Sequence, residues 1–369
     1  MTAPMTAKAD IAIVGAGMAG ASLAAMVAPH ARVILLEAED RPGYHATGRS
    51  AAFWEETYGG PGVFPLTFAS GPYLREHGFL GRRGALNIGR EEDRHKVEAF
   101  VRNFADLGAG IELLEREAME ALVPGLLPGW TCASWEPECS DIDVAGLHAH
   151  YLSLAKKAGA QVLTRAGLLS AEREGERWTL SLADGSTLNC DTMVNAAGAW
   201  ADEVAQIAGA RPLGITPLRR TVAQLRTSPA VPADMPLVLD INEQFYFKPE
   251  SGRIWLTPYD ETPSEPCDAA PEELDIAIAI DRMEHAVDWK VEAVERKWAG
   301  LRSFAPDRLP VYGFDTACEG FFWCAGQGGF GIQTAPAAAA LAASLLLGRA
   351  VSPIADGIDP APYAPGRFD

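Results

Sequence analysis

Three glycines near the start of the chain have the spacing of a nucleotide-binding turn. Gly15, Gly17 and Gly20 form the pattern G-x-G-x-x-G between a short apolar run and a helical stretch. Gly15 permits a sharp turn, Gly17 lets a pyrophosphate approach the backbone, and Gly20 lets the helix pack closely on the strand. The unpaired N–H groups at the helix N-terminus then face the phosphates. These residue types predict the binding of a dinucleotide.

Glu37 indicates which kind of dinucleotide is bound. It follows the second apolar run, 17 residues after Gly20. A carboxylate at this place accepts hydrogen bonds from ribose hydroxyls and repels a 2′-phosphate, which disfavours an NADP-type ligand. The alternative interpretation is a turn of a parallel sheet that binds no ligand.

A second glycine-rich loop, GQGGFGIQT, precedes a predicted helix that Thr334 begins and Gly348 ends. A ligand with a single pyrophosphate does not need two such loops, whereas a flavin would use the second one. Reduced isoalloxazine carries negative charge at its N1–C2=O edge, where a helix N-terminus offers N–H groups and a positive dipole. The loop therefore favours a flavin; the alternative is a glycine-rich turn that only serves packing.

The elements that carry these loops indicate an α/β sheet. Ile11–Val14 and Val33–Leu36 are predicted strands on either side of the first helix, which makes a βαβ unit. A later strand ends at Asn195, and the small residues 196–198 lead into a predicted helix at 201–207. The chain is thus predicted to return to the nucleotide-binding sheet.

Other segments predict a helix at 147–158 and several hairpins. Trp178–Leu182 and Ser186–Cys190 flank an Asp-Gly pair, which is a strong hairpin signal. From Arg211 to about Phe304 the pattern is that of antiparallel strands, with one helix beginning near Pro271. We expect this part to form a separate, substrate-binding region.

Composition excludes several classes of partner. The net charge of −18 argues against nucleic acid and anionic membranes, because both need a basic face. The six cysteines form no C-x-x-C pair, which favours reduced thiols in a cytoplasmic protein and argues against a metal site. No signal peptide is visible, and the longest apolar run, Ala335–Leu347, is too short to span a membrane. We expect a soluble protein.

Motifs along nearly the whole chain resemble one known superfamily. The matching segments are VGAGMAGAS, PGYHATGRSAA, VNAAGAWADEVAQIAGARPLGI, FYFKP, WAGLRSF and EGFFWCAGQGGFGIQT. The chain resembles the D-amino acid oxidase-like superfamily of FAD-dependent enzymes, and within it most closely the bacterial D-arginine dehydrogenases and related D-amino acid dehydrogenases. This resemblance implies non-covalent FAD and the oxidation of a D-amino acid to an imino acid, which water hydrolyses to a 2-oxo acid and ammonia.

The expected fold class is α/β, or α+β overall. It consists of a Rossmann-like FAD-binding domain with an inserted antiparallel-sheet substrate domain, and a length of 369 residues agrees with two domains. The predicted boundaries are residues 1–50, 141–212 and 305–369 for the discontinuous FAD-binding domain, and 51–140 and 213–304 for the substrate domain.

The motifs and the resemblance together imply a set of cofactor-binding residues. Besides the first glycine turn, it includes the flavin-facing loop at residues 48–51 and the second flavin loop at residues 328–333. The full set is Gly15, Gly17, Ala19, Gly20, Glu37, Gly48, Arg49, Ser50, Ala51, Ala197, Gly198, Trp200, Gly328, Gly329, Phe330, Gly331, Ile332 and Gln333.

The resemblance places the substrate carboxylate on Arg220 and Arg302 and lines the pocket with Tyr58 and Tyr246. The chemistry agrees, because a carboxylate in an apolar pocket needs forked, always protonated donors, which arginine supplies and lysine does not. Alternatives remain open. Arg220 neighbours another arginine, so one of the two is expected to face solvent; Arg302 could pair with an acidic residue, and Tyr246 could be a core residue of its strand.

Three positions depart from the D-arginine dehydrogenases. Ala85 stands where those enzymes hold the substrate guanidinium with a glutamate, Phe53 replaces a histidine, and Glu55 replaces a neighbouring polar residue. The cation anchor is therefore expected to be missing, and the favoured substrates are neutral, apolar or aromatic. Glu55 would reverse this expectation if it pointed into the pocket.

Other functions share the same expected architecture. A glycine or sarcosine oxidase and an FAD-dependent 2-hydroxy-acid dehydrogenase also hold a carboxylate with arginine. A flavin-binding assembly protein without turnover is a further alternative, which the presence of both arginines disfavours. The electron acceptor, whether a quinone, O2 or another oxidant, does not follow from the sequence.

Overall fold

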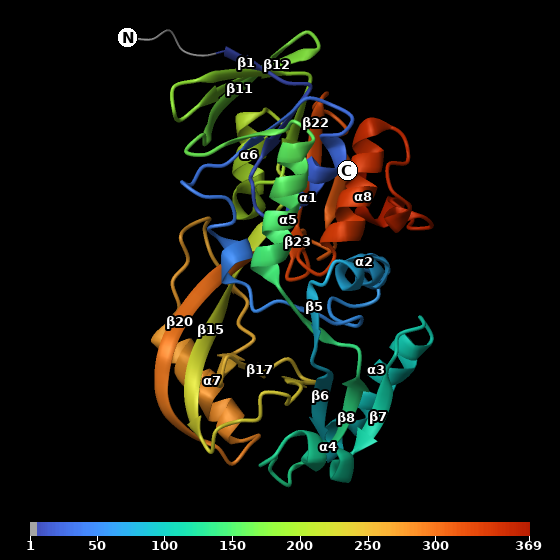
Figure 1. Ribbon diagram of the computed structural model, residues 1–369, viewed down its shortest axis with the longest axis vertical. Helices are drawn as coiled ribbons and strands as arrows, with labels where there is room; N and C mark the ends of the chain where they lie inside the picture. Colours follow the sequence, from blue (N-terminus) through green and yellow to red (C-terminus); the bar gives the residue numbers. More distant parts are fainter. Residues whose placement is uncertain (1–5) are drawn as a thin grey trace.

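The computed structural model describes residues 6–369. A six-stranded sheet lies within one half of the molecule, the upper half in Figure 1. The strand order is β10-β3-β2-β14-β22-β21, and every neighbouring pair is parallel except β22 and β21. From β2 the chain builds β3 and β10 on one side and later adds β14 and β22 on the other side. The strand order therefore reverses at β2, and such switch points are where these sheets bind ligands. The strands are β2 (Ile11–Val14), β3 (Val33–Leu36), β10 (Gln161–Leu163), β14 (Thr192–Asn195), β21 (Val311–Phe314) and β22 (Phe321–Ala325).

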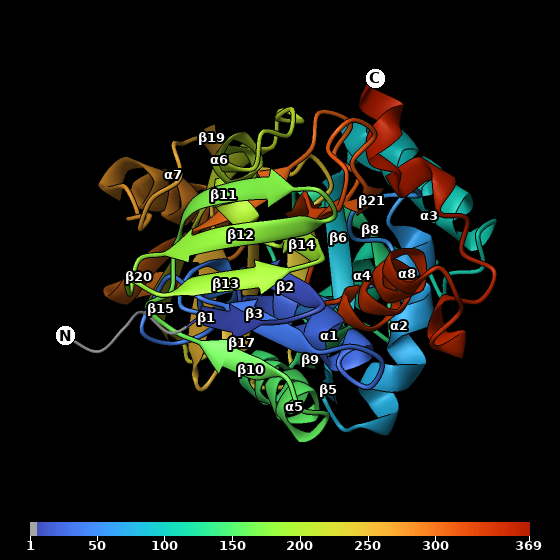
Figure 2. The same ribbon diagram turned by 90° about the horizontal axis from the view of Figure 1, so that it is seen from above.

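Helices cover one face of this sheet and a small second sheet covers the other (Figures 1 and 2). Both faces are buried, which explains why β2 and β3 consist only of apolar residues. The helices of the first face are α1 (Met18–Val27), α5 (Val144–Lys157) and α8 (Ala335–Leu347), and α2 (Phe64–Glu76) packs on α8. The other face carries α6 (Ala201–Ile207) and the sheet of β1 (Thr6–Lys8), β13 (Thr187–Cys190), β12 (Arg177–Leu182) and β11 (Leu168–Glu174).

A larger, mostly antiparallel sheet forms the other half of the molecule, in the lower part of Figure 1. Two long strands, β15 and β20, pair along nearly their whole length close to one end of this sheet. In order, the strands are β23 (Gln327–Gly328), β20 (Lys290–Phe304), β15 (Thr216–Ser228), β18 (Arg253–Thr257), β17 (Tyr246–Glu250), β16 (Leu237–Asp240), β6 (Ala85–Arg90), β8 (Trp130–Glu136) and β7 (Glu112–Glu115), with β19 (Thr262–Pro263) beside β15.

Helices α4 (Arg116–Leu122) and α7 (Glu273–Glu284) share an apolar core with one face of this sheet, and α3 (Arg94–Ala105) packs beside β6, β7 and β8. Between the halves, a three-stranded sheet joins β4 (Phe53–Trp54), β9 (Ser140–Ile142) and β5 (Leu80–Arg82). The α/β fold class with an antiparallel second sheet is confirmed. The domain boundaries proposed from the sequence remain a prediction.

Most predicted elements are confirmed, and their ends differ in ways that hydrogen bonds explain. Helix α5 begins at Val144, three residues before the predicted start, because the side chain of Asp143 caps it by accepting from the N–H of Gly146. Thr334 precedes α8 as predicted, but its hydroxyl donates to the Phe330 carbonyl and does not cap the helix. Gly348 ends α8 with a φ of +64°.

Across residues 6–369, no helix combines the length and the apolar character that crossing a membrane requires. All six cysteines are free thiols. Within the same residues, no cluster of three or more histidine, cysteine, aspartate or glutamate side chains could hold a metal ion.

Candidate active site

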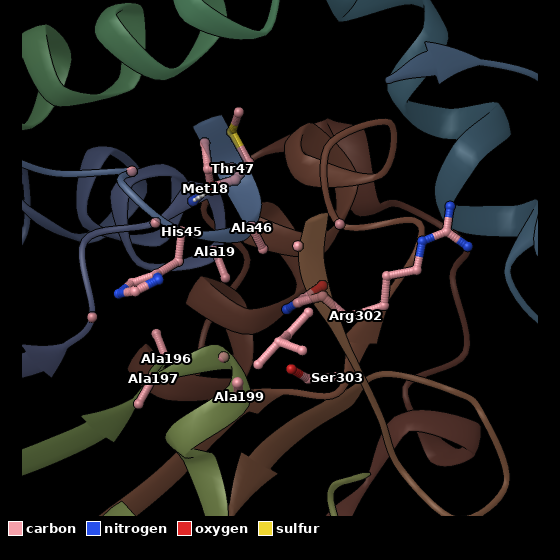
Figure 3. A pocket seen from close by; sticks show the side chains of 18 of the residues that line it. Met18, Ala19, His45, Ala46, Thr47, Ala196, Ala197, Ala199, Arg302 and Ser303 are labelled. Carbon is pink, nitrogen blue, oxygen red and sulfur yellow. Dashed lines mark hydrogen bonds between the residues drawn. The ribbon is translucent and has the colours of Figure 1, made fainter. Parts of the chain in front are cut away.

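A cavity of about 460 Å³ lies where the parallel sheet meets the large antiparallel sheet. Figure 3 shows its wall built from distant segments, with Met18, Thr47, Ala197 and Arg302 around one space. Most of the predicted site residues line it: Gly15, Gly17, Ala19, Glu37, Arg49, Ser50, Ala51, Phe53, Tyr58, Ala197, Gly198, Trp200, Arg220, Tyr246, Arg302, Gly328, Gly329, Gly331, Ile332 and Gln333.

Five predicted residues do not line the cavity, and their contacts explain why. A Cβ at Gly20 would lie 1.9 Å from the carbonyl oxygen of Gly15, so Gly20 serves the packing of helix on strand; one at Gly48 would lie 2.7 Å from another backbone carbonyl oxygen. Phe330 packs between aromatic rings behind the wall. Glu55 and Ala85 are buried in the structure behind the pocket.

The first glycine turn has the geometry that phosphate binding requires. Gly15 has a φ of +103°, and a Cβ there would lie 2.3 Å from the carbonyl oxygen of Ala196. A Cβ at Gly17 would meet only the hydroxyl oxygen of Thr47, at 3.3 Å, and otherwise face the cavity. The N-terminus of α1 thus offers backbone N–H groups to a ligand, although the Met18 N–H already donates to Thr47 at 2.9 Å.

Glu37 lies at the end of β3 with its carboxylate at the cavity wall. It accepts hydrogen bonds from the N–H groups of Ala16 at 3.3 Å and Glu39 at 3.0 Å. Burial raises its pKa from the ordinary value, while these backbone donors act in the opposite direction. These contacts fix the carboxylate beside the turn, where a ribose of the dinucleotide would lie.

The pairing of β15 with β20 brings Arg220 and Arg302 together. Arg220 lies opposite Gly300, and Arg302 lies opposite Leu218. The two arginines are therefore diagonal neighbours two residues apart, and since side chains alternate along strands they point to the same face of the sheet. Both line the cavity.

Arg302 is held by a tyrosine and by the second glycine loop. Its Nη2 donates to the hydroxyl of Tyr58 at 2.7 Å. A Cβ at Gly329 would lie 2.8 Å from its Cζ, so only glycine there leaves room for the guanidinium. Burial opposes the charge of Arg302, but the nearby tyrosine hydroxyls leave its pKa raised above the ordinary value. Arg302 is a permanent cation at the cavity wall.

Arg220 has one donor free for a ligand. Its side chain is buried; Nε donates to the Asp260 carbonyl at 2.8 Å and Nη2 to Glu261 at 3.4 Å. Its Nη1 has no hydrogen-bond partner within residues 6–369. The adjacent Arg219 pairs with Glu272 at 2.7 Å on the approach to α7, away from the cavity. A carboxylate in the cavity would satisfy the orphaned donor.

The substrate end of the cavity has an aromatic wall. The rings of Phe53, Tyr58 and Tyr246 pack edge to face, and Tyr246 belongs to a different apolar cluster from its strand neighbours, so its side chain points to the pocket. Ala85 packs in the same cluster, and the carboxyl of Glu55 accepts from Asn87 at 3.3 Å. Neither Ala85 nor Glu55 reaches the cavity surface.

Sequence reasoning missed several residues of the site. Tyr259 lies behind the cavity wall with a φ of +60°, and the centre of its ring lies 4.4 Å from the guanidinium carbon of Arg220. Cys324 and Cys267 line the cavity, although neither lies in a flavin-facing loop. Burial raises the pKa of Cys324 to about 12, so this thiol stays protonated. The structure also shows the guanidinium of Arg49 turned to Asp268, so this residue fastens the loop before α7.

Comparison with known families identifies the cavity. The FAD-dependent oxidoreductase family, DAO, matches residues 10–345. The chain belongs to this family. FAD is accordingly its cofactor, and the glycine turn, Glu37 and the open wall at Gly17 fit its pyrophosphate and ribose. The protein is a flavin-dependent oxidoreductase.

Similar proteins include a glycine oxidase and a subunit of a hydrogen cyanide synthase. The chain is 26% identical to glycine oxidase of Pseudomonas aeruginosa over 308 residues, covering 78% of this chain and 80% of that protein. It is 26% identical over 281 residues to the hydrogen cyanide synthase subunit HcnC of the same organism. That match covers 75% of this chain but only 65% of HcnC, and a match to the bifunctional protein ThiO/ThiG of Synechocystis covers 37% of that protein.

Solved structures show the same fold. Glycine oxidase from Geobacillus kaustophilus superposes with a TM-score of 0.84 at 23% identity, covering 97% of this chain and 98% of that one. L-Proline dehydrogenase from P. horikoshii superposes with a TM-score of 0.86 at 20% identity, covering 99% and 98%. The chain therefore shares the fold of these two enzymes.

Proposed function

We propose that the protein oxidises neutral or apolar D-amino acids to imino acids, which water hydrolyses to 2-oxo acids and ammonia. The observation that carries this proposal is the pair of arginines on one face of β15 and β20, in the same cavity as the FAD-binding turn. The bound flavin supplies a two-electron acceptor for the hydride that leaves Cα.

The residues of this chain would bind and orient the substrate. The forked donors of Arg302 and the free Nη1 of Arg220 hold the α-carboxylate, and Tyr58 keeps Arg302 in place. The rings of Phe53 and Tyr246 contact the side chain and exclude water. Fixing the substrate at one end in this way supplies much of the catalysis, because the reacting atoms are positioned before the step.

The principal alternative is a glycine or sarcosine oxidase. It is supported by the glycine oxidase of Pseudomonas aeruginosa, which matches this chain over 80% of its length, and by the solved glycine oxidase structure, which shares the fold over 98% of its length. The same arginine pair would hold the carboxylate of either substrate, so the side-chain pocket decides between them. A pocket built of large aromatic rings favours substrates that have a side chain to pack there.

We expect neutral D-amino acids to be the best substrates. The pocket wall at Phe53, Tyr58 and Tyr246 is aromatic, and burying a guanidinium there without a carboxylate partner would cost several kcal/mol. Anaerobic bleaching of the flavin, followed by kcat/KM values, would be measured for D-methionine, D-phenylalanine, D-leucine, D-lysine, D-arginine, glycine, sarcosine, L-proline and a 2-hydroxy acid.

Each outcome of this panel has one meaning. Preference for D-arginine or D-lysine that disappears in Glu55→Gln would make Glu55 the specificity residue and overturn the neutral-substrate proposal. Preference for glycine or sarcosine would favour the alternative, and activity only with L-amino acids or 2-hydroxy acids would contradict the D-amino acid assignment. No bleaching by any compound would support a flavin-binding protein without turnover.

We also expect FAD to be bound without a covalent bond. The flavin-facing loops at residues 48–51 and 328–333 contain no cysteine, and the Cys324 thiol at the cavity wall is kept protonated by burial. Acid precipitation should release yellow FAD into the supernatant. Flavin that stays with the pellet in the wild type but not in Cys267→Ser would show a covalent link to the exposed cysteine of the cavity.

A further inference from the structure

Two buried glutamates meet behind the aromatic wall of the pocket. Glu55 follows β4 and Glu136 ends β8, and their exposed fractions are 1% and 2%. Within residues 6–369 no lysine, arginine or histidine forms an ion pair with either carboxyl. Oε1 of Glu55 accepts from Asn87, whereas Oε2 is buried without a hydrogen-bond partner among the same residues.

A buried pair of acids without a cation holds protons. Burial raises the pKa of Glu55 to about 7. Burial also raises the pKa of Glu136 well above its ordinary value, and the charge of Glu55 raises it further. The two carboxyls titrate together, so near neutral pH the pair keeps at least one proton, and full ionisation occurs only at higher pH.

Glu136 also fastens the segment that carries Tyr58. Its Oε2 accepts from the N–H of Glu56 at 3.1 Å, and its Oε1 accepts from the hydroxyl of Thr57. On the other side, Gln333 accepts from the N–H of Glu55 at 3.3 Å and donates to the carbonyl of Tyr58 at 2.9 Å. Residues 55–58 are thus clamped between Glu136 and the second flavin loop.

The clamped segment ends at the proposed carboxylate site. The hydroxyl of Tyr58, the next residue after Thr57, accepts from Arg302 at 2.7 Å. We propose that Glu55 and Glu136 act as a proton-sharing pair that positions Tyr58, and through it Arg302, so that loss of the shared proton weakens the binding of carboxylates. This inference rests on the carboxylate role of Arg302 in the proposed function.

The other charged and titratable groups around Glu55 and Glu136 are paired elsewhere or stay neutral, so the expected pH dependence is not assigned to them. Glu56 turns its carboxylate outward to the N–H of Gly110. Cys139, in the turn before β9, has a pKa raised by burial and by the neighbouring acids, so its thiol remains neutral. Asp141 on β9 is paired with Arg83 at 2.5 Å and with Lys248 of β17 at 2.6 Å.

Tyr246 of β17 faces the same cluster, and its pKa is raised by burial, so it stays a neutral phenol up to pH 9.

The direction of the expected pH effect follows from the raised pKa values of Glu55 and Glu136. Below about pH 6 both acids are protonated and the segment is held; as the pH rises through about 7 and above, charge accumulates on two adjacent buried carboxyls. Their repulsion and desolvation outweigh the hydrogen bonds from Thr57, which favour an ionised Glu136, and so favour a displaced segment.

The test is the binding of benzoate to the FAD-loaded protein, followed by the change in flavin absorbance between pH 6 and pH 9. Benzoate carries a carboxylate but no amine, so it does not titrate in this range and needs no turnover. We expect the Kd of the wild type to rise about tenfold from pH 6 to pH 9. In the double variant Glu55→Gln/Glu136→Gln, whose amides mimic the protonated acids, the Kd should stay near the acid value of the wild type throughout.

Thr57→Val is the matched control, because it removes one contact to Glu136 without changing charge. It should weaken benzoate binding at every pH and keep the pH dependence. A wild-type Kd that does not change with pH overturns the inference even if the double variant fails to fold, and so does a double variant with the wild-type pH dependence.

The inference and the proposed function fail in different ways. Benzoate binding that is independent of pH, together with turnover of D-amino acids, contradicts only the role of the acid pair. Absence of benzoate binding at any pH contradicts the carboxylate site itself. Binding with the expected pH dependence supports the acid pair even if the amino acid panel identifies another substrate.

Discussion

Replacing Arg302 with alanine is expected to lower kcat/KM for the best amino acid substrate by about 30-fold or more while FAD stays bound. The guanidinium is buried at the cavity wall and is fixed by Tyr58, so its loss leaves a desolvated carboxylate without its main donor. Removing such a charge-assisted partner costs roughly 2–5 kcal/mol, and 2 kcal/mol corresponds to about 30-fold in rate. Steady-state kinetics and the flavin content of the purified variant measure both effects.

Arg219→Ala is the matched control for this experiment. Arg219 lies on the same strand and carries the same charge, but its guanidinium pairs with Glu272 and Asp275 outside the cavity. It should change kcat/KM by less than about threefold. Arg302→Lys separates charge from geometry, because lysine keeps the charge without the fork and should restore only part of the activity. Near-normal kcat/KM in Arg302→Ala, with FAD retained, would exclude Arg302 from substrate binding.

The FAD-binding half of the fold could be predicted from local sequence because its signals lie close together in the chain. The strands at residues 11–14 and 33–36 have the predicted bounds, and the glycine turn follows the first of them as predicted. Glu37 lies at the carboxyl end of β3. The second loop precedes α8 as predicted. Such features depend on backbone conformation and on contacts within about 25 residues, which a motif records directly.

The substrate half depended on strand register, which the sequence does not reveal. Arg220 and Arg302 come from strands far apart in the chain, and a shift of one residue in β15 against β20 would turn one of them to the opposite face. The resemblance supplied these residues, but it could not indicate that Tyr259 stacks on Arg220. The loop that carries Tyr259 has no repeating pattern to signal its position.

The meeting of Glu55 and Glu136 could not be predicted from the sequence either, because it also depends on how strands pair. The sequence alone predicts that Ala85 marks a place where the pocket lacks a carboxylate. In the structure Ala85 lies directly opposite Glu136 in the pairing of β6 with β8. A carboxyl is therefore present close to this position, but it points to the segment of Glu56 and Thr57. Only the tertiary arrangement distinguishes a missing acid from one supplied by the neighbouring strand.

Replacing Gly15 with alanine is expected to yield a destabilised protein without FAD. Gly15 has a φ of +103°, a region that costs other residues roughly 1–2 kcal/mol. The added Cβ would also lie 2.3 Å from the carbonyl oxygen of Ala196, which follows β14 and cannot shift without moving the adjacent strand. Flavin absorbance relative to protein absorbance, together with the thermal unfolding midpoint, measures the loss.

Gly17→Ala distinguishes the role of the ligand from the role of the fold. Gly17 has an ordinary backbone conformation, and a Cβ there would approach only the flexible side chain of Thr47, at 3.3 Å. The polypeptide should therefore tolerate the substitution, and the apoprotein should keep its unfolding midpoint. The added methyl group faces the cavity, where the pyrophosphate of FAD must approach the backbone, so FAD affinity should fall. Wild-type FAD affinity in Gly17→Ala would place the pyrophosphate away from this turn, whereas loss of FAD with an intact fold would locate it there.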